Sequence, residues 1–160
     1  GRSYQQILAS IGGGEGVIGM WKAFSEMVRW GWLKQDTRFP RIVVAQADGC
    51  APLVRAFRAG AESATPWENP ITHAAGLRVP GPLGDRLVLR ALRESGGAAG
   101  SASEDAIRED TRRLAESSGI DAAPEGGCAL AVTRALVRAG QLAPDSEVVI
   151  YNTGSGASYR

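Results

Sequence analysis

The start of the chain combines a short apolar run with a longer periodic one. Residues 7–9 (Ile-Leu-Ala) are apolar and are soon followed by the glycines at residues 12–14. Apolar side chains then recur every three to four positions, which is the period of a helix with one buried face. They are Val17, Trp21, Phe24 and Val28. The pattern predicts a strand, a glycine-rich loop and a helix, in that order.

Two further apolar runs have the composition of buried strands. Residues 42–45 (Ile-Val-Val-Ala) and residues 148–151 (Val-Val-Ile-Tyr) are continuous and rich in β-branched side chains. Such runs are typical of strands in a parallel sheet. After the first run, Pro52 favours the start of a helix and Gly60 marks its end. The second run is expected to form the last strand of the chain.

The middle of the chain is predicted to be a long loop followed by three helices. Residues 61–82 carry four prolines and little periodicity, which predicts a loop with a short strand at residues 76–79. Helices are expected over residues 85–94, 103–117 and 125–139. The spacing of Ser101 and Glu104 indicates a capping box at the start of the second of these helices.

Strands that alternate with helices predict an α/β fold with a mainly parallel sheet and helices on both faces. The length of 160 residues suits one domain, spanning residues 1–160. In such sheets, ligands bind at the carboxyl ends of the strands. The glycine-rich segments at residues 12–16 and 154–156 both follow predicted strands. We therefore expect them to lie together at that edge.

Composition narrows the classes of partner. The net charge is +1 and the charges are scattered, which argues against nucleic acid or a membrane surface and favours a small molecule or another protein. The chain has no apolar stretch of about 18 residues and no leader pattern. Cys50 and Cys128 are far apart in the sequence, and neither a disulfide scaffold nor a metal site is indicated, so a cytoplasmic location is expected.

The first segment with chemical potential is Gly12-Gly13-Gly14-Glu15-Gly16, which opens the first predicted helix. Glycines allow backbone N–H groups to converge on an anion, and the helix dipole adds a partial positive charge there. A phosphate is the natural ligand, provided that the Glu15 side chain points to solvent. A tight strand-to-helix turn is the structural alternative.

The same loop also fits a different cofactor. Residues 14–19 match the dinucleotide fingerprint Gly-x-Gly-x-x-Gly. That fingerprint requires an acidic residue about 20 positions further on to hold the ribose, whereas Asp48 lies farther away than that. A nicotinamide-binding domain of the Rossmann type therefore stays open as an alternative.

The second segment of interest is Asn152-Thr153-Gly154-Ser155-Gly156, directly after the last predicted strand. Small residues there hold the Thr153 hydroxyl at a strand end, where it can donate a hydrogen bond to a ring nitrogen. A polar turn near the end of the chain is the simpler reading. Together with the first glycine loop, however, the segment suggests two sides of one ligand site.

Segments in both loops and between them resemble the threonine synthases, which use pyridoxal 5'-phosphate (PLP) and have fold type II. The similar segments occur in the family's order, from about residue 7 to residue 160. They are residues 12–24 (GGGEGVIGMWKAF), 44–54 (VAQADGCAPLV), 76–80 (GLRVP), 84–85 (GD), 124–129 (PEGGCA) and 151–156 (YNTGSG). The chain departs from the family at Ser10-Ile11, where Pro-Thr is usual, and at Ala157-Ser158, where Leu-Lys is usual.

The resemblance implies a role for each loop. The PLP phosphate would bind at Gly12, Gly13, Gly14, Glu15 and Gly16, and Thr153 would contact the pyridine nitrogen. The chain would correspond to the C-terminal half of a lyase that converts O-phosphohomoserine and water to threonine and phosphate. Its partners would be a small phosphorylated amino acid, the missing N-terminal half and, in addition, other copies of the same chain.

The resemblance also implies that the chemistry is incomplete in this chain. The family's Schiff-base lysine lies in the N-terminal half, and no matching segment is present. Lys22 and Lys34 are the only lysines, and Lys22 is expected to be a solvated helix residue. No catalytic residue is therefore assigned within the chain. A serine or threonine dehydratase of the same fold and a non-catalytic module that binds a phosphorylated ligand are the remaining alternatives.

Other conspicuous side chains receive structural roles. His73 is the only histidine and, without a neighbouring nucleophile or carboxylate in the sequence, is expected to be a loop residue rather than a catalytic base. Trp21, Trp30 and Trp32 are expected to pack in the core.

Overall fold

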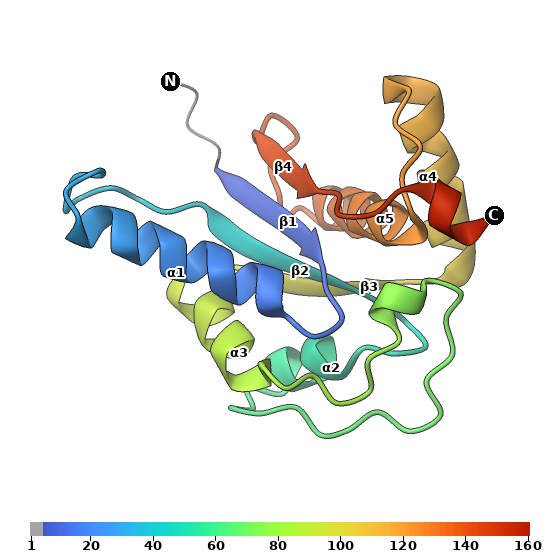
Figure 1. Cartoon of the computed structure of the whole chain (residues 1–160), viewed down its shortest axis with the longest axis horizontal. Helices are drawn as coiled ribbons and strands as arrows, with labels where there is room; N and C mark the ends of the chain where they lie inside the picture. Colours follow the sequence, from blue (N-terminus) through green and yellow to red (C-terminus); the bar gives the residue numbers. More distant parts are fainter. Residues whose placement is uncertain (1–4) are drawn as a thin grey trace.

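The centre of the computed structural model, which describes residues 5–160, is a sheet of four parallel strands. These are β1 (Gln6–Ser10), β2 (Arg41–Ala47), β3 (Ala98–Ala102) and β4 (Val148–Tyr151). Their order in the sheet is β3-β2-β1-β4 (Figure 1). Because parallel neighbours must be joined by crossovers, each connection carries helices.

Helices cover both faces of this sheet (Figure 1). On one face lie α1 (Glu15–Arg29), α2 (Pro52–Arg58) and α3 (Asp85–Glu94). On the other face α5 (Pro124–Arg138) packs against the strands, and α4 (Glu104–Ser118) packs against α5. Two short 3-10 helices, η1 (Ala75–Leu77) and η2 (Gly156–Tyr159), complete the described chain. The predicted α/β fold, with a parallel sheet covered on both faces, is confirmed.

The two central strands are buried on both sides, which explains their continuous apolar sequences. Leu8 and Val43 belong to the core cluster beneath α5, whereas Ala9 and Val44 belong to the cluster beneath α1 and α3. Successive side chains of a strand point to opposite faces, so an alternating polar pattern is not possible here. Burial in two cores, one on each face of the sheet, therefore explains the apolar sequences of β1 and β2.

The structure corrects two expectations about local structure. The strand expected at residues 76–79 is absent from the described chain, where Ala75–Leu77 form the 3-10 helix η1. The N-cap of α4 is Ser103 and not Ser101; the Ser103 hydroxyl accepts a hydrogen bond of 3.3 Å from the Ala106 backbone N–H. Ser101 is unable to cap because it lies within β3.

Strand β3 escapes prediction because its residues are small. Its sequence is Ala-Ala-Gly-Ser-Ala, which lacks the β-branched and aromatic residues that identify a strand. The small size follows from the packing of α5: a β-carbon on Gly100 would lie 2.7 Å from Cγ1 of Val132. Because α5 packs so closely, only small residues such as glycine and alanine fit in β3.

Two of the three tryptophans expected in the core lie at the surface. Trp30 and Trp32 are 53% and 70% exposed, and their rings contact each other edge to face at 5.5 Å. Both lie in the turn that follows α1. Trp21 does pack, with its ring at 5.6 Å from that of Phe39. Over residues 5–160, no helix combines the length and the apolarity needed to cross a membrane.

Candidate functional site

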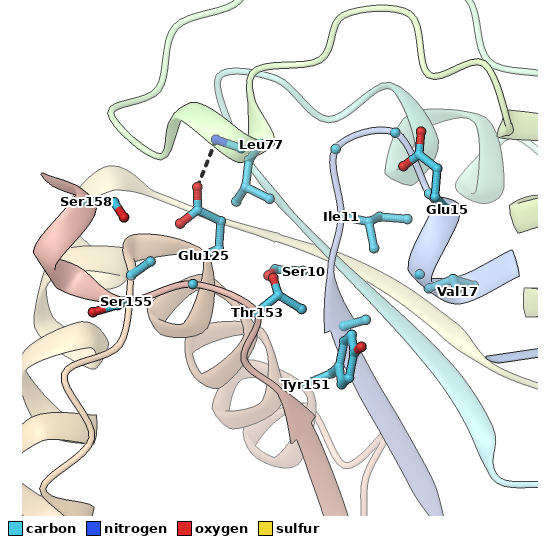
Figure 2. Close-up of a pocket in the computed structure, with 18 of the residues that line it drawn as sticks. Ser10, Ile11, Glu15, Val17, Leu77, Glu125, Tyr151, Thr153, Ser155 and Ser158 are labelled. Atoms are coloured by element: carbon cyan, nitrogen blue, oxygen red, sulfur yellow. Dashed lines mark hydrogen bonds between the residues drawn. The ribbon is translucent and has the colours of Figure 1, made fainter. Parts of the chain in front are cut away.

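A pocket of about 400 Å³ opens at the carboxyl ends of β1 and β4. The sheet pairs Ala9 with Tyr151, so the segments that follow these two strands begin side by side. Figure 2 shows the loop after β1 on one side of the pocket and Thr153 on the other. The expectation that the two glycine-rich segments meet at this edge of the sheet is confirmed.

Close packing requires glycine at two positions of the first loop. Gly14 has φ of 101°, a left-handed conformation that favours glycine, and a β-carbon there would lie 2.5 Å from Cγ2 of Val88. A β-carbon on Gly12 would overlap the carbonyl oxygen of Gly76. The loop is therefore held between α3 and η1, and its residues line the pocket.

Among the described residues, no side chain caps the start of α1, which directly follows this loop. Gly14 is the N-cap residue. The first N–H groups of a helix lack partners inside the helix and carry the positive end of its dipole. This end of α1 lines the pocket, so its geometry suits a phosphate group.

Glu15 places a negative charge in the same region. It is the first residue of α1, and the residue is exposed. Its side chain does not extend away from the loop, however, because both carboxylate oxygens lie where a β-carbon on Gly13 would be. Figure 2 shows the Glu15 carboxylate beside the loop rather than pointing along the helix.

On the opposite side, Thr153 belongs to a segment fixed against the start of α5. The Ala123 backbone N–H donates a 3.0 Å hydrogen bond to the carbonyl of Gly154, and a β-carbon on Gly154 would lie 2.9 Å from that of Ala123. The Gly156 N–H donates to the carbonyl of Asp121 at 2.9 Å. These contacts hold Thr153 at the pocket wall, exposed to a ligand.

Glu125 also lines the pocket, although no function was expected for it from the sequence. Its carboxylate Oε1 accepts a hydrogen bond from the Gly76 N–H at 2.8 Å and another from the Tyr159 hydroxyl. Burial raises the pKa of Tyr159, and the hydrogen bond and negative charge of Glu125 raise it further. The available signal was an acidic residue directly after Pro124 in the first turn of a helix. Its partners, however, come from η1 and η2, which only the fold brings together.

The described residues place no lysine in this pocket. The Lys22 side chain is 68% exposed and pairs with Glu26 one turn along α1, so the expectation of a solvated helix residue is confirmed. Lys34 is also exposed. His73 lies outside the pocket, in the loop before η1, where its Nδ1 contacts the carboxylate of Glu104. It is a loop residue, as expected, but it has a carboxylate partner that the sequence did not reveal.

The cysteines and acidic residues offer little further chemistry. Cys50 and Cys128 are free and buried, and burial raises the pKa of each thiol. A buried thiol with a raised pKa is a poor nucleophile at neutral pH. Within residues 5–160, no three side chains of His, Cys, Asp or Glu are arranged to hold a metal ion.

Comparison with known proteins identifies the family to which the chain belongs. The family model described as pyridoxal-phosphate dependent enzyme matches residues 1–154. The threonine synthase of Methanosarcina acetivorans is 33% identical over 93% of this chain and 36% of its own length. The threonine synthase of Methanocaldococcus jannaschii is 30% identical over 94% of this chain and 36% of its own length. The chain thus spans about a third of these relatives.

Solved structures agree with the fold. A threonine deaminase from T.th. superimposes with a TM-score of 0.68, at 24% identity over 95% of this chain and 50% of the deaminase. A serine racemase from maize superimposes with a TM-score of 0.74, at 19% identity over 96% of this chain and 45% of the racemase. The family match decides against the alternative of a nicotinamide-binding domain. The chain belongs to the family of pyridoxal-phosphate dependent enzymes and has the fold of its type II members.

Proposed function

We propose that this chain is the cofactor-binding part of a threonine synthase-like lyase that converts O-phosphohomoserine and water to threonine and phosphate. The observation that carries the proposal is the pocket itself, with the glycine loop and Thr153 on opposite walls. The relatives at 33% and 30% identity, both named threonine synthases, support the choice of reaction. Similarity over about a third of their length supports a part of the enzyme rather than the whole.

The residues present fit PLP at both ends. The uncapped start of α1 and the glycine-rich loop at residues 12–16 suit the phosphate. The Thr153 hydroxyl suits the pyridine nitrogen, because it can donate a hydrogen bond to that nitrogen in its unprotonated form, whereas a carboxylate would favour the protonated form. When bound, PLP supplies an electron sink for the carbanion of an amino-acid substrate.

Within this scheme the chain binds and orients the cofactor but supplies no covalent attachment. Lys22 and Lys34 are exposed to solvent, so the lysine that attaches PLP and moves the substrate α-proton would come from another part of the complete protein. Glu125 would fix the pocket wall by holding η1 and η2 together. The isolated chain is then expected to be catalytically silent and to bind PLP only non-covalently.

A chain that is only part of an enzyme is also expected to expose apolar surface. Leu83, Ile71 and Leu87 are 98%, 72% and 47% exposed, and β3 and β4 are the outer strands of the sheet. Unpaired strand edges and exposed apolar side chains favour association with a further layer of protein. We propose that the remaining part of the enzyme covers some of this surface.

The test uses the complete protein that contains this chain. With O-phosphohomoserine, threonine and inorganic phosphate should form in equal amounts. Release of ammonia and a 2-oxo acid from serine or threonine, with no use of O-phosphohomoserine, would instead establish a dehydratase. Ligand binding without any turnover would establish a non-catalytic module. Lys22→Ala is the matched control, because loss of a solvated lysine should leave both activity and PLP attachment unchanged.

A further inference from the structure

The position of the Glu15 side chain is unusual for a phosphate site. Both of its carboxylate oxygens lie against Gly13, in the middle of the glycine loop and beside the start of α1. Among residues 5–160, no lysine, arginine or histidine forms an ion pair with Glu15. No hydrogen bond from a described side chain caps the helix either. Figure 2 shows the carboxylate next to the loop that lines the pocket.

We infer that the Glu15 carboxylate covers the backbone of residues 12–16, called the phosphate cradle below. In this position it sets the affinity of the pocket for phosphorylated ligands. The inference rests on the proposed function, in which the PLP phosphate binds at residues 12–16. A carboxylate in the first turn is attracted by the same helix dipole that attracts a phosphate. The two anions repel each other and cannot share the space above Gly13, so binding of a phosphate requires the side chain to rotate away.

The physical consequence is a selective reduction of affinity. Glu15 weakens the binding of every ligand whose phosphate must enter the cradle. It leaves the binding of ligands without a phosphate almost unchanged. The side chain is exposed, so it is able to rotate into solvent without disturbing the core. It therefore acts as a mobile cover that favours ligands with enough additional contacts in the pocket over free inorganic phosphate.

The experiment compares PLP with pyridoxal, which is the same ring without the phosphate. Apparent dissociation constants are measured by fluorescence titration of the apo form of the complete protein. Glu15→Gln keeps the shape of the side chain and removes its charge, and should tighten PLP binding roughly 5- to 30-fold. Pyridoxal binding should change less than about 2-fold, and about 0.5 M salt should narrow the PLP difference because salt screens exposed charges.

Glu116→Gln is the control, because Glu116 is an exposed residue of α4 outside the pocket and carries the same charge change. Hydrogen exchange of the backbone amides of residues 12–16 is measured with and without PLP. It tests the phosphate site separately from the effect of Glu15 on affinity. If PLP protects these amides but Glu15→Gln fails to tighten PLP binding, or weakens it, the inference about Glu15 is overturned and the cradle stands. If PLP does not protect them, the proposed phosphate site itself is wrong.

Discussion

The carboxylate of Glu125 lies 2.8 Å from the backbone nitrogen of Gly76 and accepts its hydrogen bond. The two residues are far apart in the sequence, and their contact joins the start of α5 to the 3-10 helix η1. The Tyr159 hydroxyl of η2 donates to the same oxygen. One acidic side chain thus ties three segments of the pocket wall.

Removal of that carboxylate should loosen the wall. Glu125→Ala leaves the Gly76 N–H and the Tyr159 hydroxyl without their acceptor, and should lower the free energy of unfolding by about 1–3 kcal/mol. Glu125→Gln retains an acceptor oxygen and should cost less than half of that. Urea unfolding of both variants measures the difference. Equal losses in the two variants would show that charge, rather than the hydrogen bonds, stabilises the wall.

The titration of Tyr159 should respond to the same contact. Burial and Glu125 raise the pKa of the phenol, so the group stays protonated in the folded protein at a pH where it ionises in the unfolded chain. Its stabilising contribution is therefore lost as the pH rises above about 10, the ordinary tyrosine pKa. In Glu125→Gln the phenol should ionise at lower pH. Absorbance near 295 nm follows the titration, and Tyr159→Phe identifies the signal.

Two glycines near the start of the chain should respond in opposite ways to alanine. Gly14→Ala forces a left-handed alanine against Val88, and should cost about 2–4 kcal/mol of stability and sharply weaken PLP retention. Gly19→Ala lies on the exposed side of α1, where a β-carbon would meet nothing within 4 Å. It should stabilise the protein by about 0.5–1 kcal/mol. Thermal melts and PLP absorbance after dialysis measure both effects.

Thr153 should matter through its hydroxyl rather than its size. In the complete protein, Thr153→Val keeps the shape but removes the donor that we place at the pyridine nitrogen, and should lower kcat/KM about 3- to 10-fold. Thr153→Ser keeps the donor and should stay close to the wild type. Steady-state kinetics with the same substrate compare the two. A serine variant as impaired as the valine variant would argue that the methyl group, and not the hydroxyl, is what the site needs.

The fold class and most elements could be predicted from the sequence, because burial leaves a local trace there. Residues 42–45 and 148–151 are recognisable as strands from their β-branched side chains, and Pro124 and Gly140 bracket α5. The two glycine-rich segments are also recognisable as candidate ligand loops. Each of these features depends on neighbouring residues or on a burial pattern that is periodic along the chain.

Other features depend on contacts between distant segments. The strand β3 leaves no clear pattern because α5 packs so closely that only small residues fit. The segment at residues 76–79, predicted as a strand, contains part of η1, whose Gly76 N–H pairs with a carboxylate rather than with a neighbouring strand. Trp30 and Trp32 lie at the surface, in the turn that follows α1.

In the pocket, too, some features follow from the local sequence and others from contacts between distant segments. The residue types that line it, glycines after β1 and a hydroxyl after β4, were determined by the sequence and placed at strand ends by simple periodicity. Their meeting in one pocket was decided by the parallel pairing of β1 with β4. The placement of Glu125 between η1 and η2, and of the Glu15 carboxylate over Gly13, was likewise decided by the tertiary structure. The reason is that side-chain direction depends on packing against segments remote in the chain, which no local pattern encodes.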